Sequence, residues 1–333
     1  MKIDGLSIGQ KVAMVLLSVS FIAVLLTAAI FYFKSQTALR KITVEHLLSV
    51  SSQQYYQVLQ SLDRSRDQLA LITSRTQLRL SLHQWLARKR EKTAQDPLHL
   101  NKMKKILHDA KQSVPNIIDL FILDLDGNYV VSTITEPNNK VELIPNFAEQ
   151  NFTNGEPFRV TVIAGELGDN QLAYTQPLIL EGKVIGYLVL RSDLSSYNQI
   201  LLNHKGLGET EEAFLVYRNK AKQVLPLTQL KFSHSPSAQI NIDPFTIALE
   251  TLNPITVYND YRNQDVFAVT RVFPNTDWGL IFKIDQEDAM KEVISQRNFI
   301  LVALLISSVL VLLIAVFLSR SLTRSVVDMV EVA

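Results

Sequence analysis

The residue types that carry most metal and nucleophile chemistry are absent or scattered in this sequence. It contains no cysteine, which excludes disulfides, thiolate nucleophiles and cysteine metal ligands. Neither a nucleophile-elbow pattern nor a zinc-protease pattern is present. The histidines occur singly, without metal-ligand spacing: His46, His83, His99, His108, His204 and His234. The sequence therefore predicts no catalytic residue, no metal site and no cofactor within these 333 residues.

Two short strings resemble ligand-binding loops but fit turns better. Asp124-Leu-Asp126-Gly127 lacks the spacing and the closing glutamate of a calcium loop, and turn chemistry explains its residues. Gly206-Leu-Gly208 lacks the following Gly-Lys and the strand–loop–helix context of a phosphate loop. We expect both strings to form turns.

Two charge-free apolar runs flank the chain, at residues 12–33 and 298–319, each with a Lys or Arg at both borders. At about 1.5 Å per residue, a helix of this length crosses a bilayer core of roughly 30 Å. We predict two transmembrane helices. The alternative for the first run is a cleaved signal peptide, but the run is much longer than the usual apolar core of such a signal.

Two spans place residues 1–11 and 320–333 on one side of a membrane and residues 34–297 on the other. Charge counting does not decide which side is which, because basic residues flank both ends of each span. The formal charge is +1 and no basic tract occurs, so the sequence offers no electrostatic surface for nucleic acid. The intervening segment is long enough for one large domain or two small ones.

Residues 34–114 are predicted to be helical. No proline occurs before Pro97 and no glycine between the first apolar run and Gly127. Apolar residues recur every three or four positions, which favours a long stalk helix, with a break near 61–66 or 88–95 as an open alternative. A second helix is expected from 98 to 113.

Beyond residue 115 the apolar period changes from 3.6 to 2, which indicates strands. The first series covers 117–124, 129–135, 158–163, 171–180 and 183–191, with helices near 146–151 and 194–204. The second series covers 213–217, 265–272 and 278–284, with helices at 244–252 and 286–296. The fold class is thus mixed α/β (α+β): a long stalk helix with two PAS-like antiparallel-sheet modules, at 115–204 and 205–297, flanked by two transmembrane helices.

Taken together in order and spacing, four strings resemble the double Cache sensor domain of bacterial membrane receptors, followed by the start of a HAMP linker. They are Ser74-Arg-Thr-Gln-Leu-Arg79, Gly206 to Val216, Asn275-Thr-Asp-Trp-Gly-Leu280 and Arg320-Ser-Leu-Thr-Arg-Ser325. Two positions depart from the family pattern: Glu211 stands where a glycine is usual, and Ser325 where a proline is common.

The resemblance implies a small-molecule ligand in the membrane-distal module, 115–204, and a homodimer. It also implies a bacterial inner-membrane protein whose residues 34–297 are extracytoplasmic and whose residues 1–11 are cytoplasmic. A histidine kinase or diguanylate cyclase output is expected beyond Ala333, with a chemotaxis receptor as the alternative. Two alternatives come from other classes: a membrane-anchored hydrolase, for which no convergent titratable set is found, and an anchor that binds a partner protein without a ligand.

The family alignment also suggests ligand-binding residues. Arg191 stands where the family usually has an ammonium-binding aspartate, and a guanidinium there would repel an ammonium group and bind a carboxylate or other anion. Arg159, Tyr129 and Tyr174 would complete such a site. The family's Trp-Tyr pair is absent from 136–165, so free α-amino acids are not expected as ligands. The alternative is that both arginines lie on the solvent side of the sheet, and alternation favours neither reading.

Overall fold

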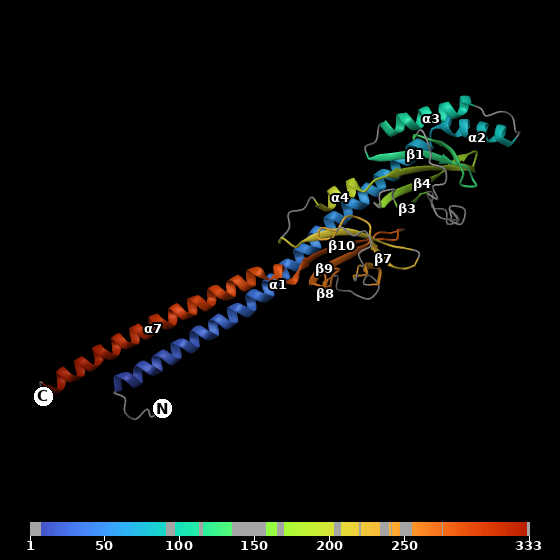
Figure 1. The fold of residues 1–333 in the computed structure, drawn as a ribbon. Coiled ribbons are helices and arrows are strands. Elements are labelled where there is room, and N and C mark those ends of the chain that lie inside the picture. Colours follow the sequence, from blue (N-terminus) through green and yellow to red (C-terminus); the bar gives the residue numbers. More distant parts are fainter. Residues whose placement is uncertain are drawn as a thin grey trace. The chain divides into compact units, whose positions relative to one another are not determined.

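The computed structural model describes residues 8–90, 97–112, 116–134, 158–164, 170–202, 208–219, 221–233, 240, 242–246, 255–274 and 276–331 (Figure 1). The chain divides into two compact units. One comprises Met1–His46, Leu207–Glu209 and Asp285–Ala333. The other comprises Leu47–Gly206 and Thr210–Ile284, and it holds both sheets.

The first unit contains the two apolar segments. Helix α1 (Ile8–Thr73) begins in it, and α6 (Gln286–Ala289) and α7 (Lys291–Glu331) lie within it. Two helical stretches, Ser18–Thr73 and Ser295–Ile314, are long and apolar enough to cross a membrane, and their most apolar windows are unburied. Apolar side chains exposed all round a helix are those that lipid would cover. The hydroxyl of Ser35 donates a hydrogen bond to the side-chain oxygen of Gln296 and so links α1 to α7.

The stalk helix α1 continues through one of the two positions at which the sequence left a break open. The break at 61–66, which the sequence left open as an alternative, does not occur. Helix α1 continues to Thr73, and the chain turns at Ser74 and Arg75 before α2 (Thr76–Arg90). At this turn the hydroxyls of Thr73 and Ser74 donate to the carbonyls of Ala70 and Leu71. Side chains that bond to backbone carbonyls in this way compete with helical geometry. Helix α3 (Pro97–Gln112) follows the predicted bounds within one residue, with proline at its first turn.

The first module is a five-stranded sheet in the order β2-β1-β5-β4-β3, antiparallel throughout. Its strands are β1 (Ile117–Leu123), β2 (Tyr129–Ser132), β3 (Arg159–Ala164), β4 (Asn170–Leu180) and β5 (Lys183–Ser192), followed by α4 (Ser195–Leu202). All five predicted strands are confirmed. The helix expected at 146–151 lies outside the described residues.

The second module repeats this arrangement, with the order β7-β6-β10-β9-β8. Its strands are β6 (Glu212–Arg218), β7 (Val224–Pro226), β8 (Ile255–Asn259), β9 (Asp265–Val272) and β10 (Trp278–Asp285). Strands β7 and β8 were not predicted; they are short, with three and five residues. Of the helix expected at 244–252, residues 244–246 are helical and the rest lies outside the described residues. The expected exit helix is interrupted at Met290, between α6 and α7.

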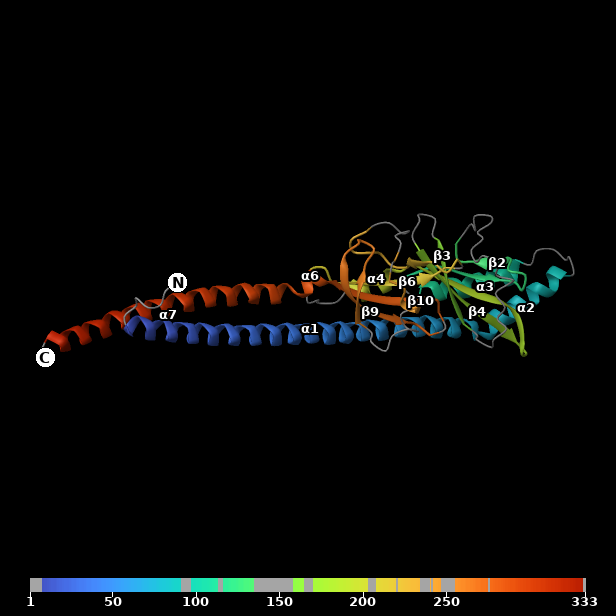
Figure 2. The ribbon, with the colours of Figure 1, turned by 90° about the horizontal axis from the view of Figure 1, so that it is seen from below.

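Within the second unit, both sheets lie along the part of α1 that follows Leu47 (Figures 1 and 2). The ring of Tyr55 on α1 stacks on Phe273, with centroids 4.7 Å apart. Arg271 on β9 donates to the hydroxyl of Ser52 at 2.5 Å. The side-chain amide of Asn170 donates to the carbonyls of Pro226 and Leu227, so the two modules also contact each other directly.

Candidate ligand-binding face of the first module

Strand register places several polar side chains on one face of the first sheet. Arg191 on β5 lies directly opposite Asp119 on β1 and opposite Ala173 on β4. Residues directly opposite each other in an antiparallel pair share a face. On β3, Thr161 pairs with Ala173 and Arg159 pairs with Thr175, two residues along. We call this surface the arginine face; it includes Asp119, Tyr129, Arg159, Thr161, Ala173 and Arg191.

Arg191 is not a solvent-side residue of the sheet. Its side chain is half-buried, and its Nε is buried without a hydrogen-bond acceptor among the described residues. A buried donor left unpaired costs on the order of 1–3 kcal/mol, so a ligand acceptor at this position would be stabilising. This geometry fits the binding of an anionic group.

Asp119 is the neighbour of Arg191 that sequence reasoning missed. It is 3% exposed, and its carboxylate accepts hydrogen bonds from the hydroxyls of Ser132 at 2.9 Å and Thr133 at 2.6 Å. Thr133 Oγ1 in turn accepts from the backbone N–H of Leu120, which fixes the hydroxyl. The sequence did contain a signal for Asp119, because it is an acidic residue inside an otherwise apolar strand. Burying a carboxylate costs free energy unless it is paired, so such a residue is expected to have hydrogen-bond partners.

Tyr129 on β2 belongs to the same cluster. Its ring packs against Phe121, with centroids 4.8 Å apart. The pKa of Tyr129 is raised to about 12, first by burial and then by the Asp119 carboxylate, while the Arg191 charge acts to lower it. The phenol therefore stays protonated at neutral pH and can donate a hydrogen bond.

The remaining two predicted residues lie elsewhere on the sheet. Arg159 shares the arginine face, but β3 is two strands from β5, which separates the two backbones by about 10 Å. Tyr174 pairs with Val160 and Leu190 and so lies on the opposite face. There it is 1% exposed, and its hydroxyl lies 2.8 Å from that of Tyr197. The fold thus brings Arg191, Tyr129 and Arg159 onto one face and leaves Tyr174 out.

The sequence model of the Cache domain family matches residues 35–293, most of the chain. This chain belongs to the Cache domain family. The sensory domain of the Campylobacter jejuni chemoreceptor Tlp3 has a similar fold, with a TM-score of 0.54, 12% identity, and coverage of 75% of this chain and 96% of that one. The ligand-binding domain of the Pseudomonas fluorescens chemoreceptor CtaA gives a TM-score of 0.54 and 11% identity, covering 78% of this chain and 99% of that one. A comparison with curated protein sequences finds no match.

Cache sensor domains are extracytoplasmic parts of membrane receptors, and two candidate membrane helices flank this one. The predicted double Cache architecture is confirmed by the family match and by the two sheets of identical strand order. The match ends at residue 293, so the HAMP linker expected from residue 320 stays a prediction.

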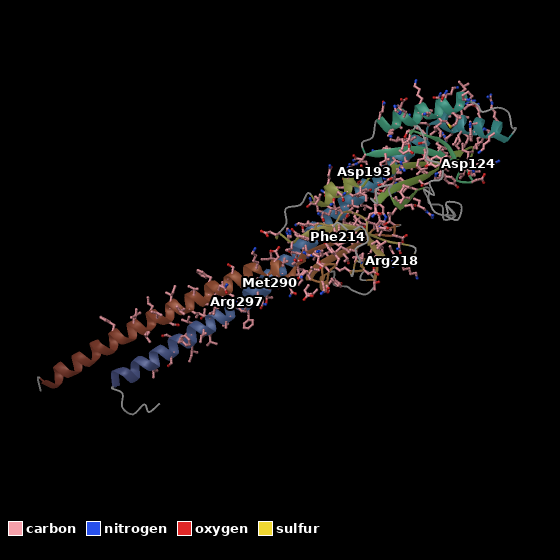
Figure 3. All side chains as sticks on the ribbon, viewed as in Figure 1. Asp124, Asp193, Phe214, Arg218, Met290 and Arg297 are labelled. Atoms are coloured by element: carbon pink, nitrogen blue, oxygen red, sulfur yellow. The ribbon has the colours of Figure 1, made fainter. Side chains whose placement is uncertain are left out.

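Two aspartates of the first Cache module, Asp124 and Asp193, have structural roles (Figure 3). Asp124 accepts hydrogen bonds from the backbone N–H groups of Asp126 and Asn128, which is turn chemistry. Asp193 accepts from the backbone N–H of Ser195 at 3.0 Å, at the start of α4. Among the described residues, no group of three or more metal-ligating side chains is close enough to hold an ion.

The second Cache module holds a buried charge cluster. Lys283 on β10 is fully buried, donates to Asp260 at 2.7 Å and forms an ion pair with Glu212 at 2.9 Å. The Tyr261 hydroxyl also donates to Glu212, and Arg262 donates to Asp260. Burial acts to raise the pKa of Asp260, but the hydrogen bonds and charge of Lys283 outweigh it, and the pKa is lowered. These groups satisfy one another, which indicates a structural role.

Proposed function

We propose that this chain is the ligand-sensing and transmembrane signalling portion of a bacterial inner-membrane receptor, and that its ligand is a small molecule with an anionic group. The ligand binds on the arginine face of the first module. Arg191 takes the anionic group, Tyr129 donates a second hydrogen bond, and Arg159 faces the same ligand from β3.

One observation carries this assignment. The buried Nε of Arg191 lacks an acceptor among the described residues, although a guanidinium in a sheet normally reaches one or stays in water. A planar guanidinium matches a carboxylate with two parallel hydrogen bonds. Structures of Tlp3 and of CtaA were determined with isoleucine bound, so related folds bind small carboxylate-bearing molecules.

Signalling would use contacts on the opposite face of the same sheet. Tyr174 on β4 contacts Tyr197 on α4, and the rings of Tyr197 and Trp278, the first residue of β10, form a T-shaped pair. Strand β10 continues directly into α6 and α7. A ligand that favours one packing of the first sheet would thereby bias β10, and a small shift or rotation of α7 would carry the signal across the membrane.

The receptor would act as a homodimer with a cytoplasmic output beyond residue 333, joined through a HAMP linker over 320–333. A histidine kinase or a diguanylate cyclase is the expected output, and a chemotaxis receptor is the alternative. Neither assignment affects the ligand site, which lies within the first module.

Thermal unfolding of the 333-residue protein in detergent tests the ligand proposal. The panel holds three carboxylic acid series: propionate, 3-phenylpropionate and glutarate, each with its 2-oxo, 2-hydroxy and 2-amino derivatives. At least one of the unsubstituted, 2-oxo or 2-hydroxy acids should raise the Tm in a concentration-dependent way, and the free 2-amino acids should not. Arg191→Ala should abolish this shift while leaving the unliganded Tm within about 2 °C. Arg75→Ala, at an exposed position between α1 and α2, is the matched control.

Two results would overturn the proposal. The first is that no acid of the panel stabilises the protein, which is the result expected of an anchor without a ligand. The second is that an acid stabilises the wild-type protein and Arg191→Ala equally.

A further inference from the structure

The two modules carry the same arrangement of charges on their central strands. Both sheets have the same strand order, so β10 of the second module corresponds to β5 of the first, and β6 corresponds to β1. Lys283 on β10 lies directly opposite Glu212 on β6, just as Arg191 lies directly opposite Asp119. Each sheet thus holds a basic residue near the end of its central strand, with an acidic residue beside it on the same face.

The two basic residues also lie on equivalent faces of their sheets. Tyr174 contacts Tyr197 from the face of the first sheet opposite Arg191. Trp278 forms a T-shaped pair with the same Tyr197 ring and, by strand alternation, lies on the face of the second sheet opposite Lys283. Arg191 and Lys283 therefore each lie on the face that turns away from Tyr197.

The two basic groups differ in what they hold. The Nε of Arg191 is buried without an acceptor among the described residues. The Nζ of Lys283 lies 2.9 Å from a carboxylate oxygen of Glu212 and 2.7 Å from one of Asp260. Asp260 is 1% exposed and belongs to the turn between β8 and β9. The second module thus supplies from its own chain a carboxylate of the kind that Arg191 would take from a ligand.

The turn between β8 and β9 fixes the Asp260 carboxylate in this position. Its Oδ1 accepts hydrogen bonds from the backbone N–H groups of Arg262 at 2.8 Å and Gln264 at 3.1 Å. Its Oδ2 accepts from the Nε of Arg262 at 2.8 Å and from the Nζ of Lys283 at 2.7 Å. These donors use the accepting capacity of one ionised carboxylate, which is about four hydrogen bonds.

The first module has no carboxylate at the corresponding position of the sequence. The connections from β3 to β4 and from β8 to β9 both have five residues, 165–169 and 260–264. Asp260 is the first residue of its connection, and Gly165 is the first residue of the other. Because glycine has no side chain, position 165 cannot supply the anion that Asp260 supplies.

We propose that Asp260 is a built-in ligand, whose carboxylate fills an anion site on Lys283 in the second module equivalent to the site that Arg191 offers to an external molecule. The comparison with Arg191 rests on the proposed function, whereas the site on Lys283 does not. The second module is then a permanently occupied relay, and the receptor takes one ligand per chain.

An anion site that a side chain fills can be emptied by mutation. Asp260→Ala leaves two cations of the cluster, Lys283 and Arg262, with one carboxylate, that of Glu212. Excess positive charge in a buried cluster is costly, so binding of an anion there is favourable. The group removed has the size of formate, whereas a longer acid such as glutarate exceeds the space left behind.

Thermal unfolding of the 333-residue protein in detergent tests this inference. All proteins carry Arg191→Ala, which removes the site of the first module from the comparison. Asp260→Ala should lower the Tm, and about 0.2 M sodium formate should then raise it by about 2–4 °C relative to equal sodium chloride. The Arg191→Ala parent should respond by less than about 1 °C, and glutarate should not replace formate. Asp260→Asn is the matched control, because it removes the charge but keeps the volume, so formate should not stabilise it.

The inference fails if formate stabilises Asp260→Ala no more than the parent, or if it stabilises Asp260→Asn or Asp260→Ala/Lys283→Met as strongly. Either result leaves the ligand proposal intact, because Arg191 is absent from every protein compared. If Asp260→Ala does not fold, Asp260→Ser replaces it, since a serine hydroxyl still accepts hydrogen bonds from the backbone of a turn. The response of that variant to formate then decides by the same criterion.

Discussion

The hydroxyls of Tyr174 and Tyr197 lie 2.8 Å apart, and both side chains are almost completely buried. Tyr197 also meets Trp278 edge to face, with centroids 6.0 Å apart and planes at 89°. Burial raises the pKa of both tyrosines, so each stays protonated and can donate at neutral pH. This pair joins the back of the first sheet to α4 and, through Trp278, to the strand that leads into α7.

Replacing Tyr197 with phenylalanine should lower stability without changing the packing of the ring. The change removes one buried hydrogen bond, worth about 1 kcal/mol, which corresponds to a Tm lower by roughly 2–4 °C for a unit of this size. Tyr56→Phe is the control, because Tyr56 is 66% exposed. The Tm of this variant should fall by less than about 1 °C. Equal shifts in thermal melts of the two variants would show that the buried pair is not stabilising.

Replacing Lys283 with methionine should be among the most damaging changes in the second module. It leaves Glu212 and Asp260 buried without their cation, and breaking a buried ion pair costs about 3–5 kcal/mol. Lys104→Met on the exposed side of α3 should stay within about 0.5 kcal/mol. Adding Glu212→Gln to Lys283→Met should recover part of the lost Tm; no recovery would contradict the pairing.

Acid should destabilise the protein through the same cluster. The pKa of Asp260 is lowered in the fold, so its contribution to stability is present above the unfolded value of about 3.9 and is lost as the pH falls through the lowered pKa. Asp260→Asn should therefore be less stable at pH 7 and show a shallower fall of Tm below about pH 4. The measurement is a set of thermal melts from pH 7 to pH 2.5, and an unchanged slope would argue against this role.

The absence of cysteine makes membrane topology directly measurable. A single cysteine at Ser74, which is exposed, should react with a membrane-impermeant maleimide in intact cells. A single cysteine at Ser325 should react only after the membrane is permeabilised, because residues after the second apolar helix are expected in the cytoplasm. Labelling of the Ser325 position in intact cells would reverse the proposed orientation.

The sequence alone determined the local elements, because they depend on short-range periodicity and on turn chemistry. The apolar runs, the long helix, α3 and all five strands of the first module follow from period 3.6 or period 2 and from the positions of glycine and proline. The role of Asp124 in a turn also followed from the sequence, because its hydrogen bonds reach no further than Asn128.

Only the tertiary structure decided which residues meet. Asp119 and Arg191 belong to strands far apart in sequence, and their pairing follows from the insertion of β5 beside β1. The register also separated Tyr174 from Arg191, because a shift of one residue along a strand reverses the face. The burial of Lys283 likewise depends on Glu212 and Asp260, which arrive from β6 and from the turn between β8 and β9. Local sequence patterns do not show such contacts, because the contacts result from the packing of segments that are distant in the sequence. A buried charge is stable only when this packing brings its charged partners next to it.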